Sequence, residues 1–140
     1  MRWRRSLTLK QHQSEYYRRL TNIRTAGDWE GWVSFFLEAV ADASIEAERN
    51  IIALSTLMNN GRRRLLASPK AGPASYRLFE MLPMMPRFTV ESARQKLVTS
   101  FPTANAAVKV LEELGIVVEM TGQKKNRRYS FQAYIDLLEN

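Results

Sequence analysis

The sequence predicts a mainly α-helical protein in two parts, and three features indicate this. Apolar residues recur at three- and four-residue steps between Trp29 and Met58, as on one face of a long helix. Ser68–Pro73 contains two prolines and a glycine without any such period, which is typical of a linker. The last third of the chain holds two short strand-like runs around a basic loop. We therefore expect a helical, dimerising region over residues 1–68 and a second domain over residues 74–140.

The composition is that of a folded globular protein. Of the 140 residues, 45% are apolar and 25% are charged, which leaves enough side chains for a core. The absence of cysteine excludes disulfides, thiolate metal sites and cysteine nucleophiles together. No window approaches the roughly 20 uncharged apolar residues that a membrane-spanning helix needs. The basic start Met1–Arg5 is not followed by the apolar segment of a signal peptide, so we expect a cytoplasmic protein with no membrane partner, cofactor or metal.

The chain carries a net charge of +7. Such an excess favours a polyanionic partner, although a charge of this size also serves solubility. The cations cluster locally, in Arg2–Arg5, Arg62–Arg64 and Lys124–Arg128. The excess is therefore not confined to one tail.

Two helices are expected in the first part, as a helical hairpin. Apolar residues near a 3.6-residue period predict a helix over Leu9–Thr25, which Ala26 and Gly27 then end. Asp28 is a good N-cap for the long helix that follows. Because Gly and Asn tolerate the left-handed conformation, Asn59–Gly61 predicts its break or C-cap.

The long helix begins with a group of large apolar side chains at helical spacing. Such a group is more typical of core and dimer-contact residues than of a ligand site. Its members are Trp29, Trp32, Phe35, Phe36 and Val40. Since the helix is apolar on two sides, we expect a homodimer.

The second part begins with two short helices and a third, longer one. A helix over Tyr76–Leu82 stops before a proline, and Thr89 can cap a second helix that ends near Leu97. Ser100 is a candidate N-cap for a helix over residues 101–114, which Gly115 would terminate. The short interval between the last two helices is typical of a helix-turn-helix.

A β-hairpin is expected directly after the third helix. The pattern predicts a strand over Ile116–Thr121, a polar basic loop over Gly122–Asn126 and a returning strand over Arg127–Phe131. A short helix over Gln132–Glu139 closes the chain. The second part is therefore predicted to be a winged helix-turn-helix whose wing spans residues 122–128.

This arrangement predicts contact with double-stranded DNA. A major groove about 12 Å wide admits one α-helix, and residues near the N-terminus of that helix reach base edges. Asn105 is suited to adenine, Thr103 to a base or a phosphate, and Lys109 to a phosphate. The predicted DNA-binding residues are Ser100, Phe101, Thr103, Asn105, Ala106, Lys109, Lys124, Lys125, Arg127 and Arg128.

Two features weigh against strong sequence readout. A hairpin rich in Lys and Arg is often a solvated turn, and basic wing residues add affinity but little sequence information. The first two turns of the 101–114 helix contain no arginine, the commonest reader of guanine. We therefore expect weak or weakly selective binding, and a protein-interaction or dimerisation module without DNA binding stays open as the alternative.

Several motifs resemble the C-terminal region of bacterial Fic-domain proteins. In the second part these are Ser100–Asn105, Leu111–Ile116 and Thr121-Gly122; in the first they are Glu15–Leu20, Gly27–Trp32 and Phe35–Leu37. The resemblance implies that the first part corresponds to helices following the catalytic motif and the second to a winged helix. It also implies a Fic-domain enzyme as partner, in the same chain or another.

The resemblance does not extend to catalysis. Fic enzymes transfer AMP from ATP to a hydroxyl with a histidine in a motif of the form HxFxDGNGR, which this chain lacks. Its one histidine, His12, lies in Lys10–Gln13 without the phenylalanine or the glycine-rich loop, and we expect it to face solvent on a helix. The chain resembles the tail of such an enzyme: a truncated gene, a cloned fragment or an independent descendant. We expect a transcriptional regulator or a regulatory tail, and no enzyme.

Overall fold

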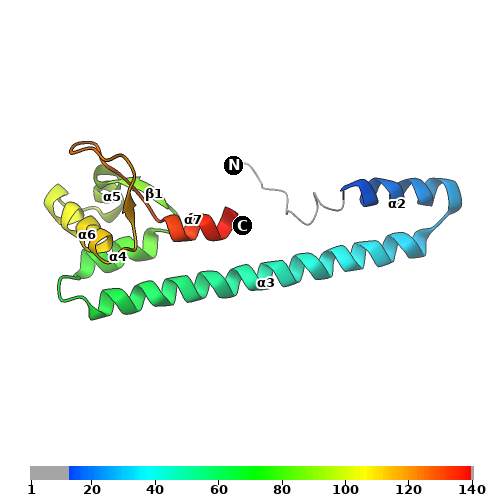
Figure 1. The fold of residues 1–140 in the computed structure, drawn as a ribbon, viewed down its shortest axis with the longest axis horizontal. Coiled ribbons are helices and arrows are strands. Elements are labelled where there is room, and N and C mark those ends of the chain that lie inside the picture. Colours follow the sequence, from blue (N-terminus) through cyan, green and yellow to red (C-terminus); the bar gives the residue numbers. More distant parts are fainter. Residues whose placement is uncertain (1–12, 140) are drawn as a thin grey trace. The chain divides into compact units, whose positions relative to one another are not determined.

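The structure, a computed structural model, describes residues 13–139. Its elements are α2 (Gln13–Ala26), α3 (Trp29–Ala67), α4 (Pro73–Met81), β1 (Arg87–Thr89), α5 (Val90–Leu97), α6 (Phe101–Glu113), β2 (Val118–Glu119), β3 (Arg128–Ser130) and α7 (Gln132–Glu139) (Figure 1). The predicted mainly helical class is confirmed. Within residues 13–139, no helix has both the length and the apolar character needed to span a bilayer.

The chain forms two compact units that divide between Ile51 and Ile52. This point lies inside α3, whereas the sequence suggested a boundary in the loop at residues 68–73. The last turns of α3 belong to the second unit because Met58 and Leu65 are buried in its core. The linker itself does separate two helices, α3 and α4.

The first unit contains α2 and the beginning of α3. The predicted end of the first helix is confirmed, because Gly27 follows α2 with a left-handed φ of +65°. Asp28 caps α3 as predicted, since its Oδ1 accepts a hydrogen bond from the Gly31 amide at 3.0 Å. The rings of Tyr16 and Trp32 pack α2 on α3, edge to face, with centroids 5.4 Å apart. The predicted start of the first helix, the Met1–Arg5 cluster and His12 lie outside the described residues.

The predicted break at Asn59–Gly61 is wrong, because α3 continues to Ala67. Gly61 is buried in this helix, and the Phe79 ring of α4 fills the space that a Cβ on residue 61 would need. The glycine is therefore required for a close approach of two helices, and its tolerance of left-handed backbone is not used here.

The helices of the second unit lie where predicted, although α4 begins at Pro73, three residues before the predicted start. Thr89 caps α5, since its Oγ1 accepts from the Ser92 amide at 3.1 Å while Ser92 Oγ accepts from the Thr89 amide at 2.9 Å. Ser100 caps α6, because its Oγ accepts from the Thr103 amide at 3.3 Å. Gly115 follows α6 with a φ of +70°. The predicted helices over Tyr76–Leu82 and Gln132–Glu139 are confirmed as α4 and α7.

The hairpin is shorter than predicted and belongs to a three-stranded sheet. Antiparallel pairing gives the order β1-β3-β2, with Phe88 opposite Tyr129 and Glu119 opposite Tyr129 on the other side. The predicted strand over Ile116–Thr121 is reduced to the two residues of β2. Ile116 and Val117 instead turn inward, where both are buried. The sequence did not predict β1 as a strand, because it consists of only three residues after Pro86, and the last of them, Thr89, is the cap of α5.

The core of the second unit lies between α4, α5, α6, the sheet and the end of α3. Helix α6 contributes Ala104, Ala107, Val108 and Leu111, which are all buried. The largest fully buried side chains are those of Phe79, Phe131, Leu65, Leu78, Leu82, Leu97 and Leu111. Burial of a side chain of this kind stabilises the fold by about 1.5–3 kcal/mol. Packing on one side leaves the opposite side of α6 exposed.

Candidate functional site

Helix α6 presents an outward face near its N-terminus. Phe101 is 51% exposed, Lys109 is exposed and Asn105 is half-buried. The opposite side of α6 includes Ala107, which is buried. The i, i+4, i+8 spacing places all three outward residues on one stripe.

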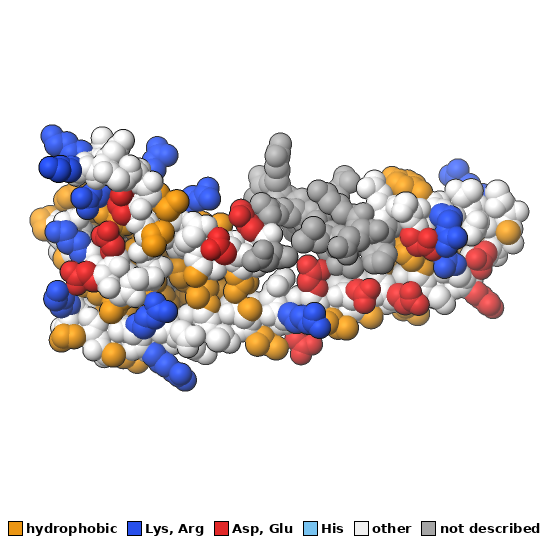
Figure 2. All heavy atoms as spheres, viewed as in Figure 1, with side chains coloured by type: hydrophobic (Ala, Val, Ile, Leu, Met, Phe, Trp, Pro, Cys, Tyr) orange, Lys and Arg blue, Asp and Glu red, His pale blue; other side chains and the backbone are white. Residues whose placement is uncertain are grey.

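This stripe forms one wall of a groove of about 870 Å³, here called the basic groove. The other walls come from the start of α5 and from the β2–β3 loop, residues 120–127. The lining residues are Thr89, Val90, Glu91, Phe101, Asn105, Lys109, Thr121, Gln123, Lys124, Lys125, Asn126, Arg127, Arg128 and Tyr129. Lys and Arg side chains gather around the β2–β3 loop in Figure 2.

Most of the predicted site residues meet in the basic groove. They are Phe101, Asn105, Lys109, Lys124, Lys125, Arg127 and Arg128. Thr103 and Ala106 are exposed on the other flank of α6, where they line a second hollow of about 630 Å³ with Lys70 and Arg77. Ser100 lines neither hollow; its hydroxyl is used as the helix cap.

Four cations of the basic groove have no ion-pair partner among the residues that the structure describes. No ion pair joins Lys109, Lys124, Lys125 or Arg128 to another residue of 13–139. The Nε of Arg127 donates to the carbonyl of Gln123 at 2.7 Å, a bond within the β2–β3 loop. Residues 52–140 hold 13 Lys and Arg against 7 Asp and Glu, a net charge of +6. The unit thus has unpaired positive charge on a concave surface.

One carboxylate lines the basic groove and was not predicted there. Glu91 stands in the first turn of α5 and is held by Arg94, whose Nη2 lies 2.6 Å from Glu91 Oε1. The hydrogen bond from the Arg94 side chain lowers the pKa of Glu91. Glu91 therefore stays ionised at neutral pH, with Arg94 as its counterion.

A second carboxylate organises the β2–β3 loop. Glu119 Oε1 accepts hydrogen bonds from the Thr121 hydroxyl and, at 2.9 Å, from the Thr121 amide; Oε2 accepts from the Gly122 amide at 2.7 Å. These bonds, the one from the Thr121 hydroxyl first, together with one from the Arg128 backbone, lower the pKa of Glu119 to about 2. This residue was not identified from the sequence. The signal available in the sequence was the position of Glu119, two residues before Thr121 and three before Gly122.

The first unit exposes most of its predicted dimer-contact residues. Trp29 is 62% exposed and Phe36 is 55% exposed; Val40 is also exposed. Trp32 and Phe35 are half-buried, and their rings lie 6.1 Å apart. None of the five is buried within its unit.

The protein-family models give no match to this sequence. Between residues 13 and 139, no three His, Asp or Glu side chains are grouped closely enough to hold a metal ion.

Proposed function

We propose that the second unit is a winged helix-turn-helix domain that binds double-stranded DNA. Helix α6 would enter the major groove, and the β2–β3 loop, as the wing, would contact the phosphate backbone. The observation that carries this proposal is the basic groove, in which the outward stripe of α6 faces four basic side chains of one hairpin.

The order of elements supports the fold assignment. Three residues separate Leu97, at the end of α5, from Phe101, at the start of α6, which is the interval of a helix-turn-helix. The β2–β3 hairpin follows α6 directly, and β1 joins the hairpin into one sheet. Because α6 packs its apolar side on the core, its outward stripe is free to meet a ligand.

The charges support a phosphate-bearing partner. Lys and Arg side chains beside an exposed helix neutralise phosphates and release counterions, which gives affinity on any sequence. Base readout is left to Asn105, because the lining of the groove contributed by α6 has no arginine. We therefore expect DNA binding that is salt-dependent and only weakly selective.

Fluorescence anisotropy with a random-sequence duplex tests this function. The association constant should fall between about 50 and 200 mM salt. A plot of its logarithm against the logarithm of the salt concentration should have a slope of about −0.9 for each phosphate contacted. The double variant Lys124→Ala/Lys125→Ala should reduce the slope by about 2. Arg24→Ala/Arg49→Ala removes the same charge from the first unit and should leave the slope nearly unchanged. Absence of binding at low salt would leave the protein-interaction alternative in place.

We further propose that two chains associate through the exposed apolar side of α3 between Trp29 and Val40. A group of large apolar side chains on the surface of one helix marks an interaction site. Pairing would bring two DNA-binding units into one particle, as two half-sites require. The resemblance to Fic proteins adds the proposal that this assembly regulates a Fic-type enzyme.

A further inference from the structure

We infer that Glu119 is a positioning residue for DNA binding: its carboxylate holds the start of the β2–β3 loop so that the basic side chains face α6. This inference rests on the proposed function. It concerns an acidic residue that does not line the basic groove but is hydrogen-bonded to the loop that does.

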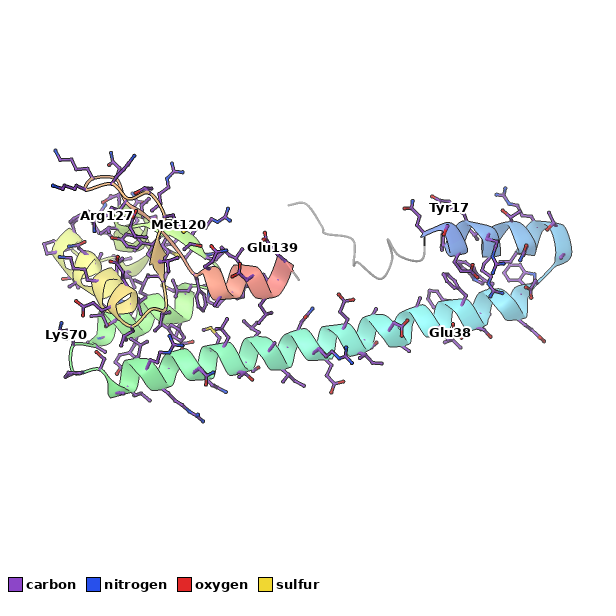
Figure 3. The ribbon with its side chains drawn as sticks, viewed as in Figure 1. Tyr17, Glu38, Lys70, Met120, Arg127 and Glu139 are labelled. Atoms are coloured by element: carbon purple, nitrogen blue, oxygen red, sulfur yellow. The ribbon has the colours of Figure 1, made fainter. Side chains whose placement is uncertain are left out.

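The loop starts at the carboxylate and ends on the opposite strand. Glu119 is the last residue of β2, and the next amide, that of Met120, donates to the Arg128 carbonyl at 2.8 Å. The chain then turns through Thr121 and Gly122, both bound to Glu119, and Gly122 takes a left-handed φ of +67°. Met120 and Arg127 mark the two sides of this loop in Figure 3.

The three donors require a group that only accepts. The Thr121 hydroxyl, the Thr121 amide and the Gly122 amide all donate, and a carboxylate offers acceptors on both oxygens. A glutamine has the same shape but places an NH₂ group against one of these donors. Its carbonyl oxygen can keep the Thr121 bonds, while the Gly122 amide loses its acceptor. Glu119→Gln therefore loosens the turn without changing its size.

The position of the basic residues makes the loosened turn costly for binding. Lys124 and Lys125 lie in the middle of the loop. Within residues 13–139, its first residues are held by the backbone bond from Met120 to Arg128, by the bonds of Thr121 and Gly122 to Glu119, and by the bond from the Gln123 amide to Thr121 Oγ1. Side chains that must be ordered on binding reduce affinity. In wild type the loop is ordered before DNA binds. Without Glu119 the loop must become ordered during binding, which reduces the affinity.

The expected loss of DNA affinity in Glu119→Gln is opposite to the change that its charge alone would cause. Removing a negative charge near a cationic surface strengthens polyanion binding when the charge acts only through its field. Glu91→Gln is the matched control, because Glu91 lines the basic groove itself and its loss frees Arg94. Positioning by Glu119 predicts weaker binding from the same change of charge.

The test compares wild type, Glu119→Gln and Glu91→Gln on one random-sequence duplex at low salt. We expect Glu119→Gln to bind about threefold to tenfold more weakly, the range set by ordering a few side chains, and Glu91→Gln to bind more tightly than wild type, because it removes a negative charge from the groove. In NMR spectra without DNA, Glu119→Gln should lower the backbone order parameters of residues 121–127 and move the Thr121 and Gly122 amide protons upfield. Circular dichroism checks that the helices persist.

The outcomes separate the two proposals. Unchanged or tighter binding by Glu119→Gln, or unchanged order in its loop, overturns the positioning role while leaving DNA binding intact. If wild type does not bind duplex at low salt, the proposed function fails, and the loss of loop order alone then shows whether Glu119 shapes the loop. Thr121→Val, which removes one donor and keeps the charge, should shift loop order in the same direction as Glu119→Gln.

Discussion

The ring of Phe79, on α4, lies against the backbone of Gly61, on α3, where any larger residue would place its Cβ. Phe79 is itself 1% exposed and packs edge to face on Phe131. The ring therefore cannot move aside, and this contact joins the end of α3 to the core of the second unit.

Gly61→Ala should destabilise the second unit. Alanine favours a helix interior by about 1 kcal/mol over glycine, but overpacking of a core costs about 1–3 kcal/mol. We expect a net loss of about 1 kcal/mol in the free energy of unfolding, measured by chemical denaturation. Ser55→Ala, at an exposed position of α3, is the control and should change it by less than about 0.5 kcal/mol. Equal effects of the two substitutions would contradict the packing explanation.

Val98 should be replaceable with a gain in stability. It follows α5 with a left-handed φ of 52° and is 87% exposed, so it is strained and gains little from burial. Left-handed backbone costs an ordinary residue roughly 1–2 kcal/mol, and asparagine tolerates it. Val98→Asn should raise the midpoint of thermal unfolding; a lower midpoint would show that the valine makes a stabilising contact.

The contribution of Glu119 to stability should depend on pH. Its folded pKa of about 2 is below its ordinary value of 4.5, so the ionised form is the one that the fold stabilises. The stability difference between wild type and Glu119→Gln should be fully present above pH 4.5 and decline as the pH falls toward 2. A difference that grows below pH 4.5 would contradict the hydrogen-bonding scheme. Denaturation of both proteins at stepped pH measures it.

Asn105→Ala should act on sequence preference. An amide in the outward stripe of α6 can pair with adenine, and a good pair of this kind discriminates by about 1–3 kcal/mol. Sequences selected from a random duplex pool should lose their preference at one position in this variant. Lys109→Ala should instead weaken binding on all sequences alike. Identical selected sequences from wild type and Asn105→Ala would exclude base readout by this residue.

Self-association and DNA binding should respond oppositely to salt. Between residues 29 and 48, α3 carries five acidic residues and no Lys or Arg, so two such helices repel at low ionic strength. Sedimentation should show a dimer that strengthens with salt and is lost in Trp29→Ser/Phe36→Ser. Leu66→Ser, an equally exposed apolar position of the second unit, should have no effect. A wild-type monomer at all concentrations and salt levels would rule out the proposed pairing.

Local signals in the sequence were sufficient for most helix ends. Thr89, Ser100 and Gly115 act through hydrogen bonds or backbone angles within a few residues, so their roles follow from residue type and position. Gly61 was misread because the same residue type serves either a helix end or a close contact. The deciding partner, Phe79, is 18 positions away and becomes its neighbour only in the fold.

Only part of the candidate site was predicted, because local sequence patterns do not show how the helices and strands pack together. Periodicity placed Phe101, Asn105 and Lys109 on one stripe, and composition identified the basic loop. The contribution of α5 through Thr89, Val90 and Glu91 depends on how the helices pack, which no local pattern reveals. The three residues of β1 form a strand only because β3 pairs with them.

The central claim is that α6 and the β2–β3 loop together contact duplex DNA. Amide chemical-shift mapping of the whole chain with a random-sequence duplex at low salt tests it most directly. The proposal predicts shifts concentrated at residues 101–109 and 121–128 that reverse on adding salt. Shifts that are absent, or that fall on α3 between residues 29 and 51, would contradict it.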